Sequence, residues 1–246
     1  MFRAELPRLY ELKDCIDDPA SHDAYFRDFD QNLAGSAHVK DIYHRYERDL
    51  QGLDDKAWEH LKEEALPRLT AHDNKGRGWQ QLFDILNEAR AYNYLKSRGC
   101  TNLRFIPRSH KRTPDLEGSL ALGRLLCEVK TINASDEEID FRAGRKKIRS
   151  GQITLPAEFL KKLRTTVECA KQQLLAFDHG RAAVHFVYLN VCFDDFLGTL
   201  KEAYLKQIDD DLARTPVTDV KLVICNDHTA FYKPLQMRSA EVDNIG

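Results

Sequence analysis

The chain has 246 residues, of which 42% are hydrophobic and 31% charged, enough apolar material for one large core or for a core domain with a smaller helical one. Its 37 Lys and Arg residues nearly balance its 39 Asp and Glu residues. The net charge of −2 excludes a protein whose whole surface attracts polyanions, so any nucleic-acid site must be a local basic patch.

The cysteines indicate the compartment. All six are scattered, without a CxxC pair or a nearby His at zinc-finger spacing, which indicates reduced thiols. The first residues, MFRAELPRLYELKDC, carry charges every few positions and contain no apolar run as long as a signal peptide or a membrane span. These features predict a cytoplasmic protein without membrane insertion.

The N-terminal part of the chain is predicted to be helical. Residues 1–72 are rich in charged and aromatic residues at heptad-like spacing and contain few strand signals. The segment AHDNKGRG, from Ala71 to Gly78, concentrates turn formers and marks a boundary. We therefore expect a helical region over residues 1–75 and an α/β domain over residues 76–246.

The α/β domain is predicted to begin with a helix and three strands. The stretch at 79–99 repeats apolar residues on one helical face and ends at Gly99. The residues of this face are Leu82, Ile85, Leu86, Ala89 and Tyr92. Three short apolar runs follow at 102–107, 118–123 and 124–132, separated by Gly and Pro as adjacent strands are. The second and third lie close enough in sequence to form a hairpin.

The rest of the chain alternates helices and strands. A polar, basic stretch at 133–152 predicts a loop. A helix is expected at 156–177, a buried strand at 182–193, a helix at 194–214 and a last strand at 217–227. The apolar face of the first of these helices comprises Phe159, Leu163, Val167, Ala170 and Leu174. His185, inside the buried strand, is interpreted as a hydrogen-bonded core histidine.

Three charged residues are predicted to converge on the hairpin. Asp115 begins one strand, while Glu128 and Lys130 lie two positions apart on its neighbour and face the same side of the sheet. Charges inside an apolar strand are costly unless they have a partner or a function. Two carboxylates and an ammonium suit a Mg²⁺-dependent phosphodiester hydrolase, because oxygen ligands hold the ion, which activates a water and stabilises developing charge.

These residues resemble the signature of the PD-(D/E)xK nuclease superfamily, the restriction-endonuclease-like fold. Pro114 and Asp115 are followed, after twelve residues, by Glu128, Val129 and Lys130. The predicted order of helix, three strands, helix and strand is also similar to the core of that superfamily, over residues 80–192. The resemblance implies an α/β fold with a mixed central sheet flanked by helices, and a metal-dependent nuclease activity.

The resemblance also implies roles for individual residues. Asp115 and Glu128 would be ligands of Mg²⁺ or Mn²⁺, together with the backbone carbonyl of Val129, and Lys130 would be the catalytic lysine. Many members carry an acidic residue on the helix before the sheet, and Glu88 matches it as a further catalytic residue and metal ligand.

A second, weaker similarity lies on the helix at 156–177. Gln173, Leu174 and Phe177 resemble the Gln-apolar-x-x-Tyr motif of the RecB-like branch, with Phe in place of Tyr. Lys171 lies close by, and basic residues also precede Pro114 and fill the loop after the Glu-Val-Lys strand. The residues expected to contact nucleic acid are Lys111, Arg112, Lys146, Lys147, Arg149, Lys171 and Gln173. DNA is the expected substrate, because most relatives act on DNA.

Other interpretations of the same residues remain open. Glu128 and Lys130 can form an ordinary ion pair on an edge strand, with Asp115 as a turn residue after Pro114. The chain can also be a non-catalytic nucleic-acid-binding or assembly protein on the same fold, contacting an accessory protein or a second copy through its N-terminal helices. A third alternative is a helical interaction protein whose α/β half is unrelated to nucleases.

Overall fold

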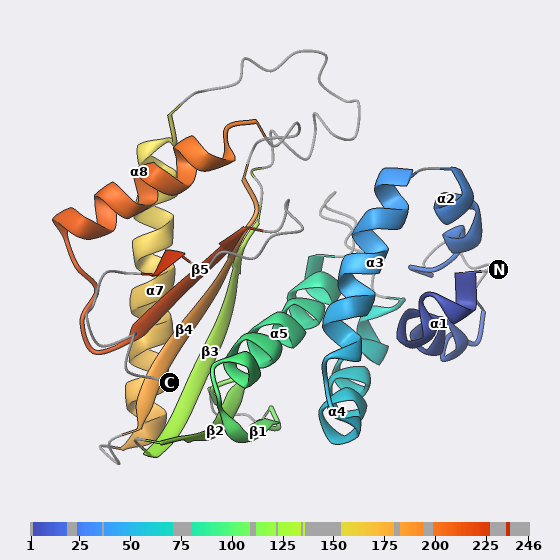
Figure 1. Ribbon diagram of the computed structural model, residues 1–246, viewed down its shortest axis with the longest axis horizontal. Helices are drawn as coiled ribbons and strands as arrows, with labels where there is room; N and C mark the ends of the chain where they lie inside the picture. The colour runs from blue at the N-terminus through green and yellow to red at the C-terminus, as the bar shows by residue number, and fades with distance from the viewer. Residues whose placement is uncertain are drawn as a thin grey trace. The chain divides into compact units, whose positions relative to one another are not determined.

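A computed structural model describes residues 2–18, 24–35, 37–70, 80–108, 112–121, 123–133, 135, 154–179, 183–193, 199–226 and 235–236 (Figure 1). The chain divides into two compact units, Met1–Tyr94 and Leu95–Gly246. The predicted domain boundary at residue 75 lies outside the described residues and stays a prediction. The division between the units falls instead near the end of a helix.

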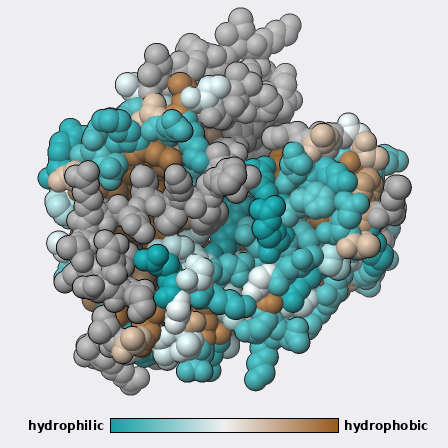
Figure 2. Space-filling model, in the orientation of Figure 1, coloured by the Kyte–Doolittle hydropathy of each residue, from teal (hydrophilic) through white to brown (hydrophobic). Residues whose placement is uncertain are grey.

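The first unit is helical. Its elements are α1 (Pro7–Asp14), α2 (Phe29–Gly35), α3 (Ala37–Gln51), α4 (Asp55–Ala65), two short 3-10 turns at Phe2–Ala4 and Leu66–Arg68, and most of α5 (Gln80–Ser97). As predicted, the described part of residues 1–72 contains no strand. Figure 2 shows mainly hydrophilic residues on the visible face of α3 and α4.

Aromatic rings hold the N-terminal helices together. The Phe29 ring makes edge contacts with the rings of Tyr10, Phe26 and Tyr43, at centroid distances of 5.3, 4.9 and 4.8 Å. Glu47, only 2% exposed, accepts hydrogen bonds from backbone amides of the first turn of α1. The sequence-predicted apolar face of α5 is buried, and residues 85–92 of this helix are buried all round, so the prediction of a single apolar face was too narrow.

The second unit is built on one mixed sheet. Its strands are β1 (Thr101–Phe105), β2 (Leu116–Leu120), β3 (Gly123–Ile132), β4 (Val184–Val191), β5 (Lys221–Asn226) and β6 (Leu235–Gln236), in that spatial order. The first three pair antiparallel, β3, β4 and β5 pair parallel, and β6 is antiparallel to β5. The prediction of an α/β class with a mixed sheet is therefore confirmed, as is the predicted hairpin of β2 and β3.

Two helices cover one face of this sheet, α7 (Ala157–Asp178) and α8 (Lys201–Arg214) (Figure 1). The predicted apolar face of α7 packs in the core between helices and sheet. Leu126 and Ile132 of β3 belong to the same core. Because side chains alternate along a strand, Glu128 and Lys130 face α7 as well, between these two residues.

A buried polar network joins the end of α7 to the start of β4. Asp178, 2% exposed, accepts from the amide of Ala183 at 3.0 Å and contacts His185 Nε2 at 3.2 Å. Arg124 approaches the other carboxylate oxygen at 3.3 Å. His185 is thus a partnered core histidine, as predicted. None of the described helices is long and apolar enough to cross a membrane.

Candidate metal and phosphodiester site

The hairpin register brings Asp115 beside the Glu-Val-Lys segment. Leu116 pairs with Cys127, and the backbone amide of Asp115 donates to the carbonyl of Cys127 at 3.1 Å. The Asp115 side chain extends to the neighbouring strand β3, where its Oδ2 accepts a hydrogen bond from the backbone amide of Val129 at 2.7 Å. One carboxylate oxygen is thereby fixed by the backbone of β3.

Glu128 is buried and held from two sides. Its side chain is 1% exposed, one carboxylate oxygen accepts from Lys130 Nζ, and the other accepts from Gln173 Nε2 at 2.7 Å. The same Gln173 nitrogen donates to the carbonyl of Thr113 at 2.7 Å. Gln173 therefore connects α7 both to β3 and to the segment that leads into Asp115.

Burial dominates the electrostatics of the carboxylates. It raises the pKa of Asp115, against the opposing effects of the Val129 amide, Lys130 and Arg108. Burial, and after it the negative charge of Asp115, raises the pKa of Glu128 to about 8, although Lys130 and Gln173 act in the opposite direction. Burial thus disfavours ionisation of both carboxylates at once, even with the Lys130 ammonium beside them.

The donor set fits a hard divalent ion. The described residues contain no group of three or more His, Cys, Asp or Glu side chains that could hold a metal, so the site offers the Asp115 and Glu128 carboxylates alone. Mg²⁺ is commonly bound through one or two carboxylates, with waters and substrate phosphates completing its coordination. The Val129 carbonyl remains a ligand implied by the family resemblance.

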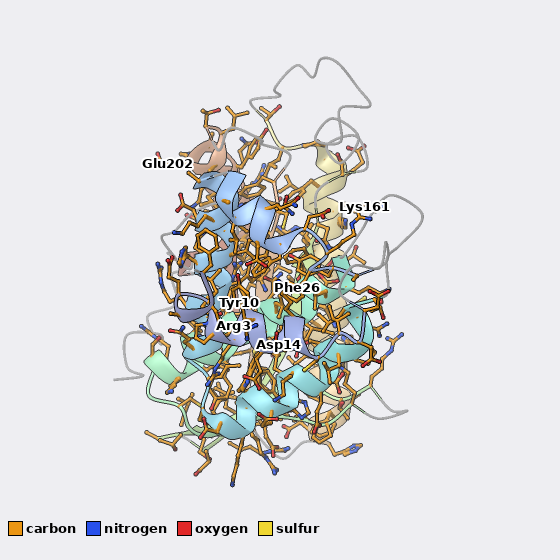
Figure 3. The ribbon with its side chains drawn as sticks, turned by 90° about the vertical axis from the view of Figure 1, so that its right-hand side faces the viewer. Arg3, Tyr10, Asp14, Phe26, Lys161 and Glu202 are labelled. Atoms are coloured by element: carbon orange, nitrogen blue, oxygen red, sulfur yellow. The ribbon has the colours of Figure 1, made fainter. Side chains whose placement is uncertain are left out.

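A groove opens beside these residues. It has a volume of about 480 Å³ and is lined by Lys130 together with one stripe of α7. The residues of this stripe are Glu158, Lys161, Lys162, Thr165, Thr166 and Cys169. Lys161 extends outward from α7 (Figure 3), and neither Lys161 nor Lys162 has an ion-pair partner among the described residues. We refer to this feature as the lysine groove.

Sequence reasoning missed the two groove lysines. Both lie on the polar side of a helix whose apolar face was identified correctly, and solvated lysines are common there. The available signal was their spacing: Lys162, Thr166, Cys169 and Gln173 recur at helical intervals and so share one side of α7.

Other predicted site residues lie elsewhere or are not described. Lys171 does not line the groove and pairs with Asp219 at 2.9 Å. Arg112 is exposed in the segment before Pro114. The remaining predicted contacts, Lys111, Lys146, Lys147 and Arg149, lie outside the described residues.

Two further predictions concern residues that the structure does describe. Glu88 is 8% exposed and lies on α5 in the first unit, so its role in the site stays a prediction. Gln173 donates to Glu128 and to the carbonyl of Thr113, and its predicted contact with nucleic acid stays a prediction.

Comparison of the chain with protein-family models, with curated proteins and with solved structures found no significant match.

Proposed function

We propose that this protein is a metal-dependent nuclease of the PD-(D/E)xK type, which hydrolyses phosphodiester bonds, in DNA in the first instance. The observation that carries the proposal is the arrangement around Glu128, a carboxylate with 1% exposure that is coupled to Asp115 and hydrogen-bonded to both Lys130 and Gln173.

The residues have distinct roles in this proposal. Asp115 and Glu128 would hold Mg²⁺ or Mn²⁺, which would activate a water and neutralise the charge developing on the phosphate. The Val129 amide fixes the orientation of the Asp115 carboxylate, and Gln173 fixes that of Glu128. Lys130, whose side chain is 34% exposed, reaches from the carboxylate into the lysine groove, where it orients the attacking water or neutralises negative charge.

A purely structural ion pair between Glu128 and Lys130 explains the positions of these residues and Asp115 less well than a metal site does. A pair between Glu128 and Lys130 needs no second carboxylate, and Asp115 makes the charge on Glu128 less favourable. β3 is moreover an interior strand with partners on both sides, so its charges do not serve to protect a sheet edge.

The order of elements supports the same family. α5, the antiparallel strands β1 to β3, α7 and β4 follow one another along the chain in the order expected for the nuclease core. The proposal therefore includes a restriction-endonuclease-like fold for the second unit.

The test is cleavage of a panel of linear, circular, single-stranded and branched DNA in Mg²⁺ or Mn²⁺. We expect metal-dependent cutting by the wild type, reduced by about 100-fold or more in Lys130→Ala and in Asp115→Asn. Lys206→Ala is the matched control, because Lys206 is 75% exposed on α8 and pairs only with Asp210 in the next turn among the described residues.

Circular dichroism must show that each variant is folded. Cutting that persists in Lys130→Ala and Asp115→Asn refutes the assigned site. Absence of cutting by the wild type, together with absence of Mn²⁺ binding in calorimetry, refutes the catalytic proposal and favours a nucleic-acid-binding protein on a nuclease-like scaffold.

A further inference from the structure

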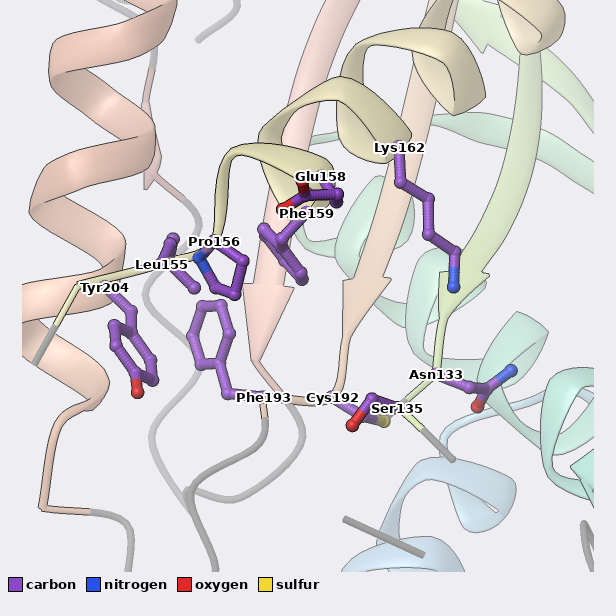
Figure 4. Close-up of a pocket in the computed structure, with 10 residues that line it drawn as sticks. All are labelled: Asn133, Ser135, Leu155, Pro156, Glu158, Phe159, Lys162, Cys192, Phe193 and Tyr204. Carbon is purple, nitrogen blue, oxygen red and sulfur yellow. The ribbon is translucent and has the colours of Figure 1, made fainter. Parts of the chain in front are cut away.

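A second cavity lies next to the lysine groove. It has a volume of about 220 Å³ and lies where β3 and β4 end and α7 begins (Figure 4). Glu158 and Lys162 line both cavities, so the two are adjacent. The site and function described above make no use of this cavity, which we call the aromatic pocket.

One side of the aromatic pocket is a fixed group of rings. The Phe193 ring lies between Phe159, at a centroid distance of 5.8 Å, and Tyr204, at 5.2 Å. Phe193 and Tyr204 are 1% and 3% exposed, while Phe159 is half-buried, so a ligand would meet a rigid floor and one accessible ring. Such a surface suits a flat aromatic ligand, which stacks on it without ordering new side chains.

The other side of the pocket is polar. Asn133, which follows β3, and Ser135 lie opposite the rings, and the Lys162 side chain extends toward them (Figure 4). A pocket that combines stacking rings with amide and hydroxyl groups matches a ring whose edge carries hydrogen-bond donors and acceptors. A nucleobase has these properties.

Positively charged side chains lie between the aromatic pocket and the proposed metal site. The Lys130 charge faces Glu128, but the lysine groove also carries Lys161 and Lys162 against the carboxylate of Glu158, so its lining favours a polyanion. Along α7, Lys162 and Gln173 are eleven residues apart, a distance of about 16 Å at 1.5 Å per residue. A chain of phosphates can therefore run from the aromatic pocket along the helix to the carboxylates.

We infer that the aromatic pocket binds one unstacked nucleobase of a single strand whose phosphates lie in the lysine groove. This inference deepens the proposed nuclease function and specifies its substrate class: single-stranded nucleic acid, or a strand with an unpaired end. A base inside an intact duplex cannot enter the pocket, because it is stacked and paired on both sides.

The test compares affinities in EDTA, so that cleavage does not interfere. The protein is titrated into two fluorescent single-stranded 12-mers of the same charge, one with bases and one whose sugars lack bases, and the two dissociation constants are compared. We expect the base-containing strand to bind about 10-fold more tightly. Phe159→Leu, which keeps an apolar side chain on the core, should remove this preference. Lys161→Ala, at a lysine that lines the groove and not the pocket, should instead weaken both strands alike and reduce their salt dependence, while Lys206→Ala should change neither.

Thiol labelling gives a second readout that needs no variant. Cys169 lines the lysine groove, Cys192 lines the aromatic pocket, and the exposed Cys15 of the first unit is the internal reference. We expect the base-containing strand to protect Cys169 and Cys192 from iodoacetamide, and the strand without bases to protect Cys169 alone.

Equal affinity for the two strands, or a preference that survives in Phe159→Leu, overturns the inference about the pocket. Such a result leaves the nuclease proposal standing if metal-dependent cutting is observed. Conversely, a protein that prefers bases and protects Cys192 but never cuts refutes the nuclease proposal and retains the pocket.

Discussion

The substitution Glu128→Gln distinguishes two roles of this carboxylate: a ligand of a divalent ion, or a structural ion-pair partner of Lys130. Gln has the shape of Glu, and its side-chain oxygen can still accept from Gln173. What it removes is the charge in a position that is 1% exposed. If Glu128 is a structural partner of Lys130, breaking the buried pair should destabilise the protein by about 3–5 kcal/mol. If the Glu128 charge is unfavourable in the absence of a bound metal ion, the substitution should stabilise the metal-free protein at alkaline pH.

The expected pH dependence follows from the raised pKa. Glu128 loses its proton at about pH 8 in the folded protein, against 4.5 for an ordinary glutamate. Between these values the folded state binds more protons than the unfolded state, so the free energy of unfolding falls as pH rises. The difference corresponds to about 5 kcal/mol over the whole interval. The gain in stability of Glu128→Gln over wild type should therefore grow by about that amount between pH 4.5 and pH 8.

The free energy of unfolding is measured by urea titration in EDTA at several pH values. Pulsed alkylation of Cys127 detects the unfolded fraction at each urea concentration. This thiol is fully buried on β3 and adjacent to Glu128, so its exposure reports on the unfolding of the sheet. Glu202→Gln, at an exposed position on α8, should leave the pH dependence unchanged. A Glu128→Gln variant less stable than wild type at pH 8 refutes this reasoning.

Three other outcomes follow from the same contacts. Mn²⁺ should stabilise the wild type in the Cys127 assay, by about 2.7 kcal/mol at a concentration 100 times its dissociation constant, and should leave Asp115→Asn unchanged. Gln173→Ala should lower the cutting rate by about 10- to 100-fold while affinity for a 12-mer in EDTA stays constant; a loss of affinity instead would make Gln173 a nucleic-acid contact. Asp178→Ala should lower the free energy of unfolding by about 3 kcal/mol, because it leaves the Ala183 amide and His185 without their acceptor, and a urea midpoint equal to wild type would contradict this.

The strands and helices of the second unit were predictable because hydrophobic periodicity determines which side of each element is buried. The segment from Gly123 to Ile132 combines an apolar run with a preceding turn, which together specify a hairpin and its register. That register alone suffices to place Asp115 near Val129. The convergence of Asp115, Glu128 and Lys130 was therefore accessible from local sequence.

The groove and the pocket were not predictable in the same way. Lys161 and Lys162 become part of a cavity only when α7 lies on β3, a contact between segments far apart in the chain. Phe159 and Phe193 read as core residues in the sequence, and their role in a pocket depends on how the ends of β4 and α7 meet. Such long-range packing leaves no periodic signal.

The strand order also bears on how quickly the site forms after the chain leaves the unfolded state. Asp115 and Val129 are fourteen positions apart and are joined by a hairpin, whereas Gln173 is 45 positions from Glu128 and arrives with a crossover helix. Short antiparallel connections close faster than parallel crossovers, because the shorter loop loses less entropy. The carboxylates are thus assembled early and enclosed late, so a divalent ion present during refolding should accelerate formation of the native sheet.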